Sequence, residues 1–313
     1  MLFILGRGRS GTSLVSRILN QHDDIVVPPE GCFIRNCHGR FKRGLETPRH
    51  ARNFVKTLRT ENRMKNWDLD FPDLVDSIVE GLPMTFQRVC HLVIEHWATH
   101  RGKGGAAIIA DKNPHYSLWA RNIGRIFPSA RFIHVVRDPY DNIASFQNVR
   151  FDINDAVGLA LRWSAFNESI LDADLGSRRF QLRYEELVEA PDTTMRDLCS
   201  FLDVDYSDGF FEYQGGKERL SSWHKNLSGP INTRRVGYGR DNLSTQQINL
   251  CSSILTPVAR CLGYEIKEEC ARANLLTLVR GKATLFSERN IYCLPLIIRS
   301  PIINAYRRWA GSL

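Results

Sequence analysis

The chain has 313 residues, of which 43% are apolar and 24% are charged. This length and composition allow a substantial buried core, which excludes a disordered, collagen-like or small disulfide-stapled protein. Residues 270–313 hold seven Lys or Arg and one acidic residue, so they supply +6 of the formal charge of +8. The rest of the chain is nearly neutral, which argues against a nucleic-acid-binding protein.

Apolar runs of strand length alternate with segments of helical periodicity. The predicted strands are 2–5, 25–27, 107–110, 132–136 and 180–182, and the predicted helices are 12–19, 116–126, 140–148, 156–171 and 192–202. This alternation predicts an α/β fold whose central parallel sheet is flanked by helices on both faces. Residues 32–105 are irregular and rich in Arg, His and Pro, with helical stretches at 48–60 and 82–99. We expect them to form an insertion that faces the substrate.

A glycine-rich turn, residues 6–13, joins the first predicted strand to the first predicted helix. Such a turn directs backbone N–H groups and a helix N-terminus at an anion. Gly6, Gly11 and Ser13 fit the Walker pattern, but Thr12 replaces the required lysine, which disfavours ATP hydrolysis.

The same turn also fits the dinucleotide-binding pattern G-x-G-x-x-G. Its glycines are Gly6, Gly8 and Gly11, and Glu30 lies near the distance expected of a ribose-binding acid. An NAD(P)-type oxidoreductase or a nucleotide-binding regulatory protein therefore remains an alternative.

A second anion-binding pattern follows the strand at 132–136. Arg137 ends the strand, Asp138 can cap the next helix, and Pro139 suits its first turn. Arg137 and Ser145 then offer a guanidinium and a hydroxyl at the carboxyl edge of the sheet, where open α/β folds bind ligands. An ion pair of Arg137 with Asp138 or Asp141 on a solvated turn is the alternative.

Other patterns bear on metals and membranes. The eight cysteines form no C-x-x-C pair, so we expect reduced thiols and no zinc. The longest apolar stretch, 293–303, is interrupted by Pro and Arg and is too short to span a bilayer. The apolar residues 1–5 are too few for a signal peptide. We expect a cytoplasmic protein, or a Golgi-lumenal one if an N-terminal anchor has been removed.

Taken together, these motifs resemble those of the sulfotransferase family that uses 3′-phosphoadenosine 5′-phosphosulfate (PAPS). In motif style they are most similar to the tyrosylprotein and carbohydrate enzymes. The ordered matches are residues 9–14 (R-S-G-T-S-L), 111–114 (D-K-N-P), 137–139 with Ser145 (R-D-P and Ser), 183–187 (R-Y-E-E-L) and 235–240 (R-V-G-Y-G-R).

The resemblance implies a set of residues that bind PAPS and its product PAP. They are Arg7, Gly8, Arg9, Ser10, Gly11, Thr12, Ser13, Arg137, Ser145, Tyr184, Arg235 and Gly237. Residues 9–13 would hold the 5′-phosphosulfate, and Arg137 with Ser145 would hold the 3′-phosphate.

The resemblance also implies catalytic roles without a metal. Glu30 would be the general base, with His115 in reserve, since cytosolic small-molecule sulfotransferases use histidine. Lys112 would meet the bridging oxygen, where charge grows as the S–O bond breaks, and Arg9 would neutralise the phosphosulfate. The tyrosylprotein enzymes carry an arginine two residues after their glutamate, where this chain has Cys32.

We therefore expect residues 1–265 to form a PAPS-dependent sulfotransferase domain acting on a hydroxyl of a glycan or glycolipid. A tyrosylprotein or small-alcohol acceptor is the alternative. Trp67 and Trp97 of the insertion are compatible with an anionic or sugar acceptor and equally with an ordinary packed insertion. The basic segment 266–313 would be an accessory that could contact a membrane surface, since it mixes apolar side chains with arginines.

Overall fold

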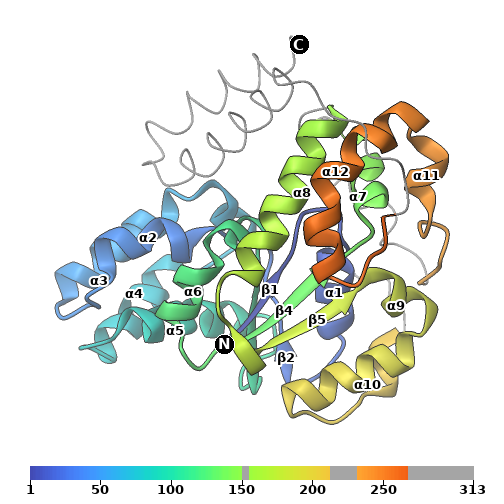
Figure 1. Ribbon diagram of the computed structural model, residues 1–313. Coiled ribbons are helices and arrows are strands. Elements are labelled where there is room, and N and C mark those ends of the chain that lie inside the picture. Colours follow the sequence, from blue (N-terminus) through green and yellow to red (C-terminus); the bar gives the residue numbers. More distant parts are fainter. Residues whose placement is uncertain (150–154, 212–230, 267–313) are drawn as a thin grey trace.

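A five-stranded parallel sheet in the order β2-β3-β1-β4-β5 forms the centre of the structure (Figure 1). The computed structural model describes residues 1–149, 155–211 and 231–266. The strands are β1 (Leu2–Leu5), β2 (Ile25–Val26), β3 (Ile108–Lys112), β4 (Arg131–Val136) and β5 (Arg179–Arg183). Because every neighbouring pair is parallel, all five carboxyl ends meet at one edge. The predicted α/β class is confirmed.

Helices cover both faces of the sheet, because successive residues of its buried strands point to opposite sides. Ile133 joins a cluster with α1 (Thr12–Leu19), α9 (Tyr184–Glu189) and α10 (Pro191–Leu202). Phe132 joins the opposite cluster, which includes helices of the insertion. Val136 packs with α7 (Pro139–Gln147), α8 (Ala156–Leu171) and α12 (Thr245–Cys261). Both faces of the sheet are therefore buried under helices, as is usual for a parallel sheet.

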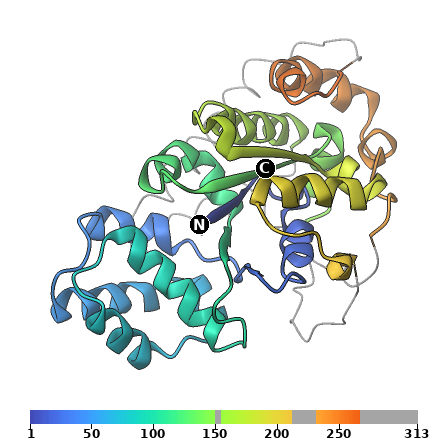
Figure 2. The same cartoon turned by 90° about the horizontal axis from the view of Figure 1, so that it is seen from below.

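The insertion is more regular than the sequence suggested. Its helices are α2 (Phe33–Phe41), α3 (Pro48–Arg59), η1 (Asn62–Asn66), α4 (Phe71–Glu80) and α5 (Phe86–Thr99), and they form a group beside the sheet (Figure 2). Helices α3 and α5 match the predicted stretches, whereas α2 and α4 were not predicted. Trp67 and Trp97 are buried, with ring centroids 5.9 Å apart, so they build the core of the insertion and not its acceptor surface.

Other element boundaries refine the prediction. The segment 116–126 is divided between η2 (Pro114–Trp119) and α6 (Ala120–Ile126). The short elements η3 (Gly176–Arg178), η4 (Asp208–Phe211) and α11 (Tyr238–Asn242) complete the described part. The Asp138 side chain accepts from the backbone N–H groups of Tyr140 and Asp141 at 2.9 and 3.0 Å, which confirms the predicted cap of α7.

The basic segment at the C-terminus lies outside the described residues from position 267 onward, so its accessory and membrane roles stay predictions. Within the described residues, no helix combines the length and the apolar character needed to cross a membrane.

Substitution at Gly6 tests the packing of the glycine-rich turn against the sheet. Gly6 has φ of 148°, and a Cβ there would lie 2.3 Å from the Val135 carbonyl oxygen. We expect Gly6→Ala to lower the free energy of unfolding by about 1–3 kcal/mol, since backbone must shift to relieve the overlap. Gly39→Ala in α2 is the control, because a Cβ there meets nothing within 4 Å. Equal urea midpoints for the two variants would contradict this account.

Candidate functional site

The glycine-rich turn at the end of β1 has a backbone geometry suited to an anion. Arg9 and Gly11 both lie in the left-handed region, at φ of 65° and 101°, and α1 begins immediately afterwards at Thr12. The Asn142 amide donates to the Gly8 carbonyl at 2.9 Å and to Ser10 Oγ at 3.0 Å, which ties the turn to α7. Backbone N–H groups at such a helix start favour a bound phosphate or sulfonate.

Arg7 anchors this turn through its side chain. Its guanidinium carbon lies 4.2 Å from the ring centroid of Phe146 and 4.6 Å from that of Phe166. Arg7 is buried, so these cation–π contacts are well shielded from water. The family resemblance assigns Arg7 to nucleotide binding. In the structure, its contacts with Phe146 and Phe166 stabilise the conformation of the turn.

Guanidinium groups from distant segments gather beside the turn. Arg9 Nε donates to Ser145 Oγ at 3.2 Å, and Arg137 Nη1 donates to the Arg9 carbonyl at 3.3 Å. Burial lowers the pKa of Arg9, and the charges of Arg137 and Arg235 lower it further. Like charges held this close repel one another, and a multiply charged anion would relieve that repulsion.

The late loop that carries Arg235 and Gly237 is fixed by Asp141. The two Asp141 oxygens accept from the backbone N–H groups of Gly237 at 3.0 Å and Gly239 at 2.6 Å, and the carboxylate lies 3.5 Å from Arg137. Arg137 also donates to the Arg235 carbonyl at 2.5 Å. The predicted Arg137–Asp141 ion pair therefore exists, yet it is part of the cluster and not a solvated turn.

Tyr184 begins α9 directly after β5 and lies against both the glycine-rich turn and Arg137. The Arg137 guanidinium carbon is 4.5 Å from the centre of its ring, and a Cβ at Gly11 would come within 2.8 Å of its Cδ2. The structure thus brings the predicted Tyr184 to the predicted nucleotide residues.

Glu30 and Lys112 meet at the ends of β2 and β3. Lys112 Nζ lies 2.5 Å from Glu30 Oε1 and 3.3 Å from Ser13 Oγ, so one ammonium joins the predicted base to the turn. Burial acts to raise the pKa of Glu30, but the charges of Lys112 and Arg63 outweigh it and lower the pKa to about 2. Glu30 is therefore an ionised carboxylate at neutral pH.

Arg63, from η1 of the insertion, completes this cluster. It lies 2.6 Å from Glu30 Oε2, and its Nη2 is 3.3 Å from His115 Nε2. Burial and the Arg63 charge hold the pKa of His115 well below its usual range, so the ring is neutral. Because the guanidinium can only donate, it occupies the His115 Nε2 lone pair, and this favours Glu30 over His115 as the base.

Asp111 and Asn113 flank Lys112 and have different tasks. Burial and the nearby Glu30 charge raise the pKa of the Asp111 carboxyl well above its usual range. Asn113 Nδ2 donates to the Gly31 carbonyl at 3.0 Å and contacts Cys32 Sγ at 3.2 Å. These contacts position the loop that carries Glu30.

Arg63 was not predicted as a site residue. It lies 33 positions after Glu30 in the chain, and only the folding of the insertion brings the two side chains together. Asp141 was predicted only as a partner of Arg137, and Asn142 was not assigned. Asp141 and Asn142 lie two and three residues after Pro139 of the R-D-P motif, so the first turn of a helix at a sheet edge was the available signal.

The Glu30 ion pairs should give the protein a pH-dependent stability. The folded pKa of about 2 lies below the ordinary value of about 4.3 for the unfolded chain. The contribution of Glu30 is therefore present above about pH 4.5 and is lost as the pH falls toward 2. We expect the difference in unfolding free energy between wild type and Glu30→Gln to shrink from pH 6 to pH 3.5. Urea unfolding measures it, with exposed Glu46→Gln as the control; a constant difference would contradict the prediction.

Comparisons with known proteins identify the family of this chain. A model described as the sulfotransferase family matches residues 2–208. Protein-tyrosine sulfotransferase 1 of Danio rerio is 22% identical over 282 residues, covering 85% of this chain and 72% of the relative. Nodulation protein NoeE of Sinorhizobium fredii is 25% identical over 320 residues, covering 93% of this chain and 72% of the relative.

A solved structure shares the fold. The sulfotransferase domain from the Synechococcus PCC 7002 olefin synthase matches with a TM-score of 0.62 and 22% identity, covering 85% of this chain and 94% of that one. The family match spans the turn, Glu30, Lys112, Arg137 and Tyr184. The chain therefore belongs to the sulfotransferase family.

Proposed function

We propose that the protein transfers the sulfuryl group of PAPS to an acceptor hydroxyl, releasing PAP and a sulfate ester. The observation that carries this proposal is the position of Lys112, which contacts Ser13 of the anion-binding turn and Glu30. An anion cradle, a cation and a carboxylate base thus adjoin one another, as transfer between a phosphosulfate and a hydroxyl requires. The catalytic domain would comprise residues 1–265.

Each group has a task in this reaction. Residues 9–13 and Arg9 bind the 5′-phosphosulfate, while Arg137, Ser145, Tyr184, Arg235 and Gly237 bind the 3′-phosphate side of the nucleotide. Glu30 takes the acceptor proton as the acceptor oxygen forms its bond to sulfur. Lys112 stabilises the phosphate oxygen that departs with the electrons of the broken S–O bond.

Donor binding and base strength are coupled through Lys112. The ammonium lowers the pKa of Glu30 while it remains 2.5 Å from the carboxylate. A donor anion at the turn competes for this ammonium, so Glu30 becomes a stronger base when the donor is in place. This coupling favours proton removal after both substrates have bound.

For the acceptor we propose a glycan or glycolipid hydroxyl. A cavity of about 610 Å³ is lined by the aromatic or imidazole side chains of His38, Phe86 and Trp119 and by the cations Lys42, Arg43 and Arg125. The elements α2 and η2, which follow Glu30 and Lys112 in the chain, contribute to its wall. Flat rings beside cations suit a sugar that carries anionic groups.

A protein tyrosine is the second candidate. Relatives include proteins named protein-tyrosine sulfotransferase, and Arg63 places a guanidinium beside Glu30 although residue 32 is cysteine. The decisive experiment is transfer from labelled PAPS to panels of glycans, glycolipids and tyrosine peptides. Labelling of tyrosine peptides alone would replace the glycan proposal, and no transfer to any panel would contradict the sulfotransfer proposal.

The donor assignment predicts selective stabilisation by PAP. PAP should raise the melting temperature by mass action, whereas NAD and ATP at equal concentration should have much smaller effects. Arg9→Ala should weaken PAP binding because it removes a charged partner of the anion, whereas Arg52→Ala at an exposed position of α3 should not. Equal stabilisation by NAD, or unchanged PAP affinity in Arg9→Ala, would contradict the assignment.

The base assignment predicts a separation of binding from chemistry. Glu30→Gln should retain PAP affinity and lower kcat by roughly 10²–10⁴, the usual effect of losing a general base. Single-turnover transfer from labelled PAPS measures the chemical step. Near-wild-type transfer would assign the base to another group.

Arg63 should act by positioning Glu30. We expect Arg63→Gln to lower kcat by roughly 10- to 100-fold, since a small misplacement of a reacting group is costly. Its PAP affinity should not change. Lys65→Gln, an exposed neighbour in η1, is the matched control. An equal loss of activity in both variants would point to a general defect of the insertion.

A further inference from the structure

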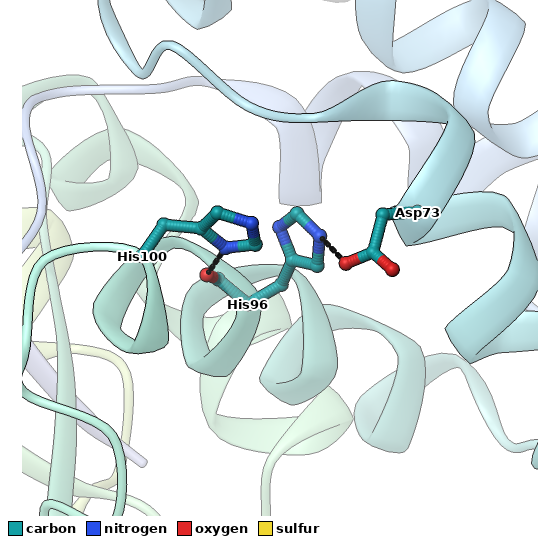
Figure 3. A group of neighbouring side chains, drawn as sticks. All are labelled: Asp73, His96 and His100. Carbon is teal, nitrogen blue, oxygen red and sulfur yellow. Dashed lines mark hydrogen bonds and ion pairs between the residues drawn. The ribbon is translucent and has the colours of Figure 1, made fainter.

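Three side chains of the insertion gather where α4 packs against α5, away from the groups assigned to sulfuryl transfer. They are Asp73 of α4 and His96 and His100 of α5, and each offers a ligand atom within 4.8 Å of the others (Figure 3). The two histidines are four residues apart, so they share one face of the helix. Their ring centroids are 4.4 Å apart.

Hydrogen bonds assign one N–H to each ring. His100 Nδ1 lies 2.8 Å from the His96 carbonyl oxygen, which can only accept, so Nδ1 carries the proton and Nε2 a lone pair. His96 Nε2 lies 2.9 Å from Asp73 Oδ2, and a carboxylate likewise takes the N–H. The lone pair of neutral His96 is therefore on Nδ1.

The His96 Nδ1 atom has no hydrogen-bond partner in the described part of the chain, although its side chain is only 4% exposed. Figure 3 shows this nitrogen on the edge of the ring that faces His100, whose second nitrogen lies on the facing side. The His96 lone pair is buried, and Asp73, His96 and His100 each offer a ligand atom within 4.8 Å of the others, which is close enough for one ion to be shared. A cation shared in this way would satisfy the lone pairs of both histidines.

We propose that His96 Nδ1 and His100 Nε2 bind a divalent transition-metal ion of the zinc type, with Asp73 orienting His96 through its Nε2–H. A carboxylate bonded to the outer nitrogen of a ligating histidine fixes the tautomer and strengthens the ligand. Imidazole nitrogens select zinc, nickel or copper over magnesium and calcium, which prefer oxygen. Asp73 and His100 are exposed, which gives the ion and its remaining water ligands access.

This ion would stabilise the insertion. Asp73 belongs to α4 and both ligands belong to α5, so the site reinforces the contact between these helices. The segment η1, which carries Arg63, precedes α4 by a short link, residues 67–70. Metal binding would thus support the wall beside Glu30 without entering the reaction.

Calorimetric titration of the metal-free full-length protein with Zn²⁺, together with thermal unfolding, tests the proposal. We expect one equivalent to bind and the melting temperature to rise by several degrees, whereas Mg²⁺ has no effect. Asp73→Asn should weaken zinc binding 10- to 100-fold. His100→Ala should abolish this binding event and the shift, and because His100 is exposed the variant should fold normally.

His91→Ala is the matched control, since it removes a histidine from the same helix and should keep the zinc response. It also controls for zinc binding at cysteine thiols, which both variants retain. Equal zinc responses in His100→Ala and His91→Ala, or no response in wild type, would overturn the proposal. Neither result depends on sulfuryl transfer, so this experiment tests the metal site independently of the proposed function.

Discussion

Parallel pairing of the strands is the constraint on which the candidate site depends. Because the five carboxyl ends meet at one edge, residues more than a hundred positions apart become neighbours there. The glycine-rich turn follows β1, Glu30 follows β2, Lys112 ends β3, Arg137 follows β4 and Tyr184 follows β5. Helices bury both faces of the sheet. Polar side chains therefore gather at the edge formed by the carboxyl ends of the strands.

Much of this arrangement could be predicted, because strands and turns leave local signals. Short apolar runs marked the strands, and glycines followed by an apolar helix marked the anion cradle. Asp138 and Pro139 predicted the start of α7, and the hydrogen bonds of the Asp138 side chain confirm this prediction. The family motifs then connected these signals into one expected site, and each predicted nucleotide residue from 7 to 13 lies in the turn.

The remaining features arise from tertiary packing and have no local pattern. Arg63 reaches Glu30 only after α2 and α3 have folded, and the sequence could not decide between packing and acceptor contact for Trp67 and Trp97, which are buried. The zinc expectation considered cysteine pairs alone. A His-x-x-x-His spacing at 96–100 was visible in the sequence, but the position of Asp73 and the tautomers depend on how α4 meets α5.

Tyr184 has a consequence for ligand selection that charge alone would not give. Its ring lies against Gly11 on the side of the cradle and against the Arg137 guanidinium on the other anion-binding group. In the proposed donor site, this aromatic ring would set the spacing between the groups that bind the two anions. A ligand with two anionic groups would then be selected by the distance between them, so isomeric bisphosphates of equal charge would be distinguishable.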